Sequence, residues 1–389
     1  FGSSIFERGP SFSSAGCPFY AARMGKKGGG CLQACGIYAF LAALGFGMYF
    51  GPNRLKNMSY QLRQGYGAFL SLYDIPLEEL DAFVESFKVF EREEDEFYRN
   101  STADFQSVKD YYRVLNRLCS LGNVEKMYIP PVMDPSVGVF ENQLLYEHGF
   151  ADELSTGPGK KLLEAGCGRG RISHTVASKT GSHVTAFNID PTQLEIARKY
   201  ARESGLLGSQ LEFVEQNMND KFPWPDNHFD GFYQVQAMTY AQNLTAVFCE
   251  ISRVLKPGAK MSVLDGVAKD GYNSSDPAHR LLLARTREVT GFGVIVHHNA
   301  WRKAVEDCGM RIITDKELSK GGKQGLLIIQ EMRYFSVMMG LVNLLTAVKL
   351  LPYHFSILME RLNRHIEAFI EMDDRELLTT SWHIMAQKI

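Results

Sequence analysis

One glycine-rich segment constrains the fold of this chain more than any other. The sequence K-L-L-E-A-G-C-G-R-G (161–170) places an apolar run directly before Gly166, Gly168 and Gly170, and a helical pattern starts near Arg171. Glycines let the backbone turn tightly and approach a ligand without a Cβ in the way, and a helix N-terminus offers unpaired N–H donors. The segment predicts a strand, a tight turn and a helix. Alone it is a weak signal, because it fits either a dinucleotide site or a simple turn.

Short β-rich runs alternate with helical segments from about residue 160 to 317. Strands separated by roughly ten to twenty helical residues indicate βαβ units. The chain is therefore predicted to be an α/β protein with a doubly wound, mostly parallel sheet. The predicted strands are 161–166, 183–188, 211–216, 229–235, 260–265 and 311–318.

Charge and cysteine content exclude several classes of protein. Among 389 residues, 42 Lys and Arg stand against 44 Asp and Glu, which leaves a formal charge of −2. This balance lacks the basic footprint of a general nucleic-acid binder, so no nucleic-acid partner is expected. The seven cysteines are scattered and lack C-x-x-C spacing, which argues against a disulfide framework or a zinc site and favours a reducing compartment. No metal site is predicted.

Three segments precede the predicted sheet. Residues 1–30 are rich in Ser, Gly and basic residues, which indicates either the remnant of an organellar targeting segment or a disordered lead-in. Residues 31–50 carry no charge and would extend about 30 Å as a helix, so 31–51 is predicted to be a transmembrane helix, with a buried core helix as the alternative. Residues 52–135 are expected to form a helical region, because apolar residues recur at three-and-four spacing. Residues 136–318 would form the main domain.

The C-terminal segment, 319–389, is predicted to form a helical lid and a final strand at 381–389. Its apolar run 335–348 ends near Lys349 and Pro352, which makes it too short to cross a membrane comfortably. We expect an amphipathic lid over a substrate pocket, lying in the membrane surface. A helix buried against the sheet is the alternative.

Residues around the glycine turn extend its pattern. Glu164 precedes the glycines at E-x-G-x-G-x-G spacing, the next strand ends in A-F-N-I-D (186–190), and E-I-S-R-V-L-K-P-G-A (250–259) follows the fourth strand. This combination resembles the class I S-adenosylmethionine (SAM)-dependent methyltransferases. The resemblance implies a Rossmann-like, seven-stranded sheet and SAM as cofactor. The residues that it implies for SAM binding are Glu164, Gly166, Gly168, Gly170, Asn188, Gln193 and Asn217.

Within that family, the chain most resembles the sterol 24-C-methyltransferases. The likeness is carried by A-F-N-I-D-P-T-Q (186–193), F-P-W-P-D-N-H-F-D-G-F-Y (222–233) and D-G-Y-N-S-S-D-P-A-H-R (270–280). Two departures concern the acceptor: Gln236 and Tyr240 stand where the family has Glu and His. A third, Asn217, replaces the usual adenine-binding Asp and still offers a carbonyl oxygen.

Candidate catalytic residues follow from the chemistry of methyl transfer. If the acceptor is an alkene, a cation forms, which aromatic faces stabilise while a base removes a proton. The candidates are Tyr240, Tyr233, Asp265 and His279. One of His297 and His298 is a further candidate. Each could instead be a core, capping or surface residue.

These observations define three hypotheses of function. The first is a membrane-anchored SAM-dependent methyltransferase acting on a lipid, sterol-like or prenyl acceptor. The second is an N- or O-methyltransferase for a soluble or amphiphilic acceptor, and the third is a methyltransferase-like, inactive structural subunit of a large membrane protein complex. A single-pass membrane protein of a mitochondrion or plastid is expected, rather than one of the endoplasmic reticulum.

Overall fold

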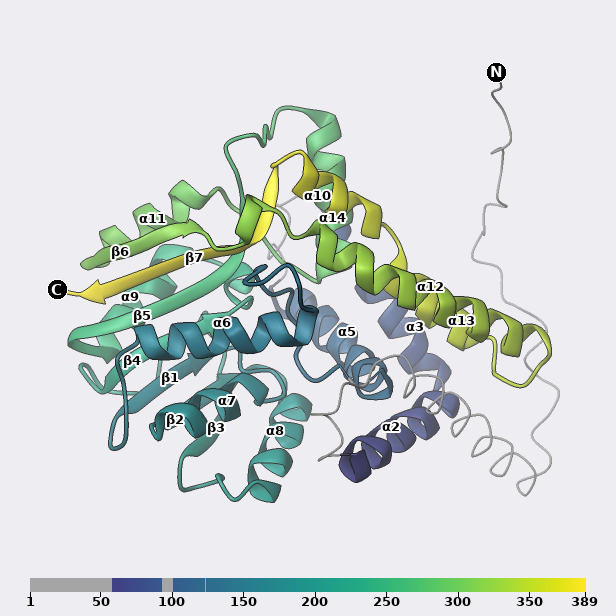
Figure 1. Ribbon diagram of the computed structural model, residues 1–389, viewed down its shortest axis with the longest axis horizontal. Coiled ribbons are helices and arrows are strands. Elements are labelled where there is room, and N and C mark those ends of the chain that lie inside the picture. The colour runs from purple at the N-terminus through teal and green to yellow at the C-terminus, as the bar shows by residue number, and fades with distance from the viewer. Residues whose placement is uncertain (1–57, 93–100, 123) are drawn as a thin grey trace. The chain divides into compact units, whose positions relative to one another are not determined.

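All six strands predicted between residues 160 and 318 lie in one seven-stranded sheet, and the C-terminal strand is the seventh (Figure 1). The computed structural model describes residues 58–92, 101–122 and 124–389. The predicted targeting segment and transmembrane helix, 1–30 and 31–51, lie outside these residues. The chain divides into two units, 1–50 and 51–389, and only the second is described below.

The sheet has the order β3-β2-β1-β4-β5-β7-β6. Strands β1 to β5 pair in parallel, whereas β7 is antiparallel to both β5 and β6. This confirms the α/β class and the mostly parallel sheet. The strands are β1 (Lys161–Ala165), β2 (His183–Asn188), β3 (Leu211–Glu215), β4 (Phe229–Val235), β5 (Leu255–Ala268), β6 (Met310–Glu317) and β7 (Leu378–Lys388).

Helices cover both faces of the sheet, as the doubly wound prediction requires. One buried cluster packs Phe248 and Trp301, from α9 and α11, on the strands, and a second packs Phe150 and Leu194, from α6 and α8, on the opposite face. The helices are α2 (Met58–Tyr73), α3 (Leu77–Ser86), α4 (Lys88–Glu91), α5 (Ser101–Leu121), α6 (Val139–Glu153), α7 (Arg171–Thr180), α8 (Pro191–Glu203), α9 (Leu244–Val254), α10 (Pro277–Thr290), α11 (His298–Asp307), α12 (Gly325–Ala347), α13 (His354–Asn363) and α14 (Ile366–Asp374).

The fifth strand is longer than predicted. It begins at Leu255, where the sequence pattern indicated the end of a helix, and runs to Ala268. Pro257 has no amide hydrogen to continue a helix, and Gly258 has a φ of +79°. The helix therefore stops at Val254 and the strand starts at the next residue.

The described part of the chain forms one disulfide, although the scattered cysteines argued against a disulfide framework. Cys249 on α9 and Cys308 after α11 are bonded, with their Cα atoms 4.8 Å apart. Their 59-residue separation carries no spacing signal, and the two helices bring them together by packing side by side on the same face of the sheet.

The apolar run near the C-terminus belongs to a longer helix than its sequence suggested. Helix α12 has 23 residues, because 325–334 continue it toward the N-terminus. Among the described residues, α12 is the one helix that is long and apolar enough to cross a membrane, and only 19% of its most apolar stretch is buried. This low burial argues against the alternative of a helix buried against the sheet.

Candidate active site

The glycine turn lies between β1 and α7, at the carboxyl edge of the sheet. Gly166, Gly168 and Gly170 all have positive φ values, between +53° and +71°. A Cβ on Gly166 would lie 2.3 Å from the Cβ of Ala237, whereas one on Gly168 would have its nearest neighbour at 3.7 Å. Gly166 therefore serves close packing of the backbone, and Gly168 leaves space in a cavity that it lines.

The end of β2 supplies the next group of polar side chains. Asn188 donates its amide hydrogen to the Oε1 of Gln193, and Gln193 donates in turn to the Oδ1 of Asn116, 3.2 Å away on α5. Asp190 caps α8 through one carboxylate oxygen, which accepts from the backbone N–H of Thr192 at 2.9 Å. The other oxygen of Asp190 and the Nδ2 of Asn116 are buried without a hydrogen-bond partner.

Asn217 lines the cavity just beyond β3. Its Oδ1 accepts from the backbone N–H of Asn219 at 3.0 Å and from the side chain of Asn219 at 3.1 Å. Asn219 also donates to the backbone oxygen of Tyr240 at 3.0 Å. These bonds hold the turn after β3 against the segment after β4, so Asn217 contributes to the cavity wall as part of a structured turn.

Helix α5 covers the cavity with one face. Phe105, Val108, Lys109 and Tyr112 line it at the spacing of successive helical turns. Residues at and just beyond the end of α5 bind the side chains of the glycine turn. Arg169 donates to the backbone oxygen of Val124 at 3.0 Å and to Ser120 at 2.8 Å, and Arg171 forms an ion pair with Glu125.

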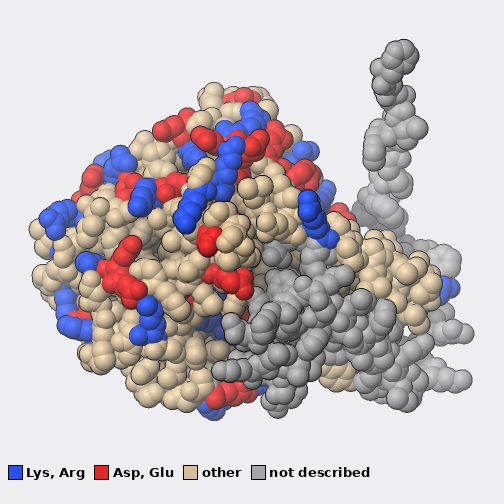
Figure 2. All heavy atoms as spheres, in the orientation of Figure 1, with Lys and Arg blue, Asp and Glu red and all other residues tan. Residues whose placement is uncertain are grey.

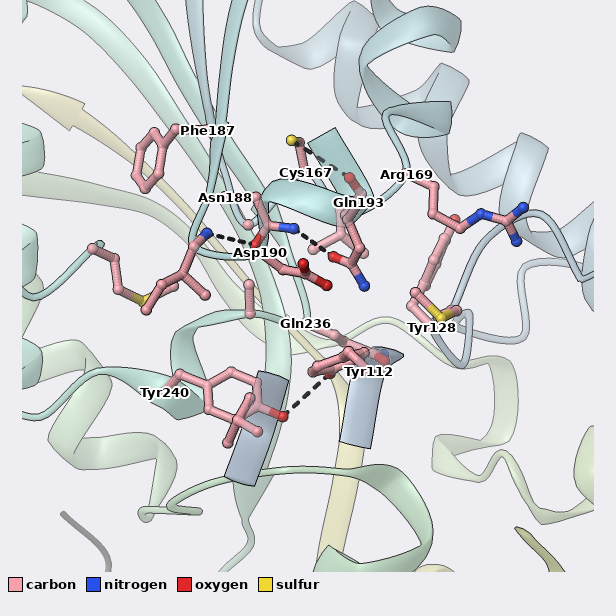
Figure 3. A pocket seen from close by; sticks show the side chains of 18 of the residues that line it. Tyr112, Tyr128, Cys167, Arg169, Phe187, Asn188, Asp190, Gln193, Gln236 and Tyr240 are labelled. Carbon is pink, nitrogen blue, oxygen red and sulfur yellow. Dashed lines mark hydrogen bonds between the residues drawn. The ribbon is translucent and has the colours of Figure 1, made fainter. Parts of the chain in front are cut away.

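Two tyrosines close the end of the cavity that lies away from the glycine turn. The hydroxyls of Tyr112 and Tyr240 are 3.2 Å apart, and Tyr240 donates to the backbone oxygen of Gly291. In Figure 3 this pair lies at one end of the cavity, with Cys167 and Gln193 at the other. Since the carbonyl of Gly291 can only accept, the proton shared between the hydroxyls comes from Tyr112.

Gln236, at the end of β4, joins three segments of the chain. Its Oε1 accepts from the backbone N–H of Ile129 at 3.0 Å, and its Nε2 donates to the oxygens of Ile129, at 2.6 Å, and Thr380, at 2.8 Å. Its φ is +51°. A carboxylate here could not donate to the two carbonyls, so the amide suits this structure.

Glu164, Tyr233 and Asp265 lie in the core and line no part of the cavity. Glu164 accepts from Ser173 and from the hydroxyl of Tyr233 at 2.9 Å, and burial raises the pKa of Glu164 to about 7. Asp265 accepts from the backbone N–H of Met238 at 2.7 Å, and burial raises its pKa to about 7 as well. Both carboxyls therefore stabilise the strands and turns that carry the cavity-lining residues, without reaching the cavity themselves.

The predicted histidines lie elsewhere. His279, on the first turn of α10, accepts at Nδ1 from the backbone N–H of Asn273 at 3.0 Å. His297 and His298 both direct Nε2 toward Asp270, at 3.2 and 3.0 Å. Because the Nδ1 of His297 accepts from a backbone N–H, its Nε2 carries the proton and donates to Asp270, which does not suit metal binding.

The structure therefore brings together six of the predicted residues around one cavity, and it adds others that the sequence did not single out. The predicted residues that line the cavity are Gly166, Gly168, Asn188, Gln193, Asn217 and, from the acceptor set, Tyr240. The Gly170 backbone starts α7 beside the cavity without lining it. Additional lining residues include Phe105, Lys109, Tyr112, Tyr128 and Asp190. The helical repeat 105–108–109–112 is the one sequence signal that could have indicated the first three.

Comparison with known proteins agrees with this geometry. Residues 163–263 match the sequence model of a family described as methyltransferase domain. The methyltransferase phqN of Penicillium fellutanum is 36% identical over 148 residues, which cover 38% of this chain and 45% of that protein. The sterol 24-C-methyltransferase ERG6A of Gibberella zeae is 32% identical over 174 residues, 45% of each chain. The chain thus spans a little under half the length of these relatives.

A solved structure shows the same fold. Geranyl diphosphate methyltransferase, in complex with GPP and sinefungin, superposes with a TM-score of 0.52 at 18% identity, over 70% of this chain and 94% of that one. Fold, glycine turn and family match define a class I SAM-dependent methyltransferase domain. Within that class, the domain is related to the sterol 24-C-methyltransferases.

Proposed function

We propose that this chain is a SAM-dependent methyltransferase acting on a lipid, sterol-like or prenyl acceptor. The observation that carries the proposal is one cavity that runs from the glycine turn to the aromatic residues of α5 and Tyr240. A cavity of this kind can hold a polar methyl donor at one end and an apolar acceptor at the other. The names of the related sterol and geranyl diphosphate methyltransferases support the acceptor class.

The residues at the glycine turn fit SAM. The backbone of Gly166 and Gly168 would hold its methionine part, and a Cβ on Gly168 would point into the cavity, 3.7 Å from the Oε1 of Gln193. Asn188 and the unpartnered oxygen of Asp190 would accept from the ribose hydroxyls, and Asn217 would contact the adenine. SAM supplies a methyl group on a sulfonium, and the protein aligns the acceptor with it in a site shielded from water.

The other end of the cavity fits an apolar acceptor. Phe105, Val108 and the rings of Tyr112 and Tyr240 provide apolar surface, and the two hydroxyls provide the polar contact. We therefore keep Tyr240 as the acceptor-facing candidate and add Tyr112. Tyr233 and Asp265 are assigned to support the site, because both are fully buried behind it.

Calorimetric titration with SAM and with S-adenosylhomocysteine tests the proposal. Wild-type protein should bind both with micromolar affinity. The Gly168→Ala variant should stay folded, because its Cβ would come no closer than 3.7 Å to a neighbouring atom, and should bind at least about tenfold more weakly, because that Cβ enters the donor end of the cavity. Absence of binding by folded wild-type protein would overturn the proposal. If SAM binds, labelled methyl from SAM is next sought in lipid extracts and in aqueous products. The fraction that carries the label distinguishes a lipid acceptor from a soluble one.

A second function remains a hypothesis, that of a methyltransferase-like subunit of a membrane protein complex. Gln236 favours it, since both polar atoms of its side chain make contacts within the protein. Folded protein that binds neither SAM nor its demethylated product, and that copurifies at fixed stoichiometry with a membrane complex, would establish this function instead.

A further inference from the structure

Helix α12 presents an apolar stripe to solvent along its whole length. Leu326, Ile329, Val337, Leu344 and, just past the helix end, Val348 are all exposed, with Leu326 at 71% and Leu344 at 59%. At 100° per residue these positions fall within about 60° of one line along the helix. The exposed apolar residues therefore lie along one side of the helix, with Arg333 among them, and this side is here called the α12 stripe.

The opposite side of the helix is already covered. Leu327, Val342 and Leu345 are buried, and α13 packs along α12. A soluble amphipathic helix has one apolar face, which it buries, and polar residues on the other. Helix α12 is apolar on both faces, so the stripe needs a cover that the described chain does not supply. Because its buried face stays on the protein, the helix is placed to lie along an apolar phase and not to cross it.

Two exposed basic residues lie on and beside the α12 stripe. Arg333 lies on the α12 stripe and Lys349 lies just past the end of the helix, and both are exposed. Figure 2 shows the surface over α12 and α13 as mostly uncharged, whereas charged atoms are spread over the rest of the visible face. A basic, apolar helix side matches the interface of a bilayer that contains anionic lipids.

The connection between α12 and α13 also exposes an aromatic residue close to a basic one. Tyr353 is 67% exposed there, four residues after Lys349. Tyrosine and lysine side chains are enriched where a protein meets the headgroup layer. Helix α13 also packs on α2, through a bond between His354 and the backbone oxygen of Leu72 at 2.8 Å.

We infer that the α12 stripe docks on the surface of a lipid bilayer, with α12 parallel to the membrane plane and Arg333 and Lys349 facing anionic headgroups. This goes beyond the proposed reaction, since no residue of α12 lines the cavity. It holds whether or not the chain transfers a methyl group.

Tryptophan quenching in vesicles tests the inference. The full chain is reconstituted in vesicles of phosphatidylcholine and phosphatidylserine in which the phosphatidylcholine carries bromine on its acyl chains. Leu344→Trp should be quenched strongly relative to wild-type protein. The matched control is Lys303→Trp on α11, where the native side chain is 75% exposed, and it should not be quenched. Equal quenching of the two variants would mean that protein, such as a second copy or another segment, covers the stripe, and would overturn the inference.

The charges give a second readout. Arg333→Gln and Lys349→Gln should each lower the affinity of the protein for vesicles with phosphatidylserine by about fivefold. Neither should change the affinity for pure phosphatidylcholine. An unchanged affinity for the anionic vesicles would contradict the assigned orientation, even if Leu344→Trp is quenched.

Discussion

The two ends of the cavity are built in different ways. At the glycine-turn end, the cavity is lined by Gly166 and Gly168, which follow β1, and by Asn188, the last residue of β2. The local sequence already indicates the place of each. At the α5 end, Tyr112 meets Tyr240 from a position 128 residues earlier in the chain. The glycine-turn end depends on backbone conformation, and the α5 end depends on side chains brought together by packing.

This difference predicts which substitutions the site should tolerate. A backbone turn with positive φ values admits few residues other than glycine, so its sequence pattern is strict. Side chains on a covering helix can be exchanged while the cover persists, and with them the acceptor can change. Gln236 is also constrained, since its amide holds the segment around Ile129 to the sheet edge.

The largest expected effect comes from Gly166→Ala. The new Cβ would overlap Ala237 at 2.3 Å, and alanine is strained at a φ of +67°, so the free energy of unfolding should fall by about 3 kcal/mol. Gly168→Ala meets only the strain and should lose about 1 kcal/mol. Denaturant unfolding of both variants measures the difference, and equal losses would contradict the distinct roles given to the two glycines.

Gln236→Glu restores the acid that the sterol methyltransferases carry and should still destabilise this protein. Near pH 8 the carboxylate cannot donate to the oxygens of Ile129 and Thr380. The free energy of unfolding should therefore fall by about 2 kcal/mol. The loss should shrink toward pH 4, where a protonated carboxyl regains a donor. Gln236→Met, measured at both pH values, is the control and should show no such recovery.

Burial of Glu164 predicts a pH dependence of stability. Its folded pKa of about 7 lies above the ordinary value of 4.5, so the folded state holds a proton that the unfolded state releases between those pH values. The stability of the wild-type protein should therefore fall as pH rises from about 4.5 to 7. Glu164→Gln should remove roughly 2 kcal/mol of the decrease between pH 5 and pH 8. Parallel stability curves for the two proteins would show that Glu164 ionises normally.

The smallest expected effect concerns the tyrosine pair. Tyr112→Phe and Tyr240→Phe should each lower the free energy of unfolding by about 1 kcal/mol. The double variant should lose less than the sum by about 0.5 kcal/mol or more, because the hydroxyls share one hydrogen bond. A strictly additive double variant would show that the two hydroxyls do not meet at this end of the cavity.

Much of the fold was predictable because it rests on local patterns. Alternating strands and helices define the sheet, and Asp190 followed by Pro191 starts α8 as its sequence indicates. The chain reversal that makes β7 antiparallel to its neighbours carries no such local pattern. Neither does the disulfide between Cys249 and Cys308, which depends on the packing of two helices.

By itself, the sequence determined the α/β class, the glycine turn and the polar residues that follow β2 and β3, because each depends on neighbours within a few positions along the chain. Only the tertiary structure decided that Glu164 and Tyr233 support the site from the core, that α5 forms its cover, and that α12 keeps an apolar side exposed. These outcomes depend on which surfaces meet, and contacts between distant segments are set by packing of the whole chain.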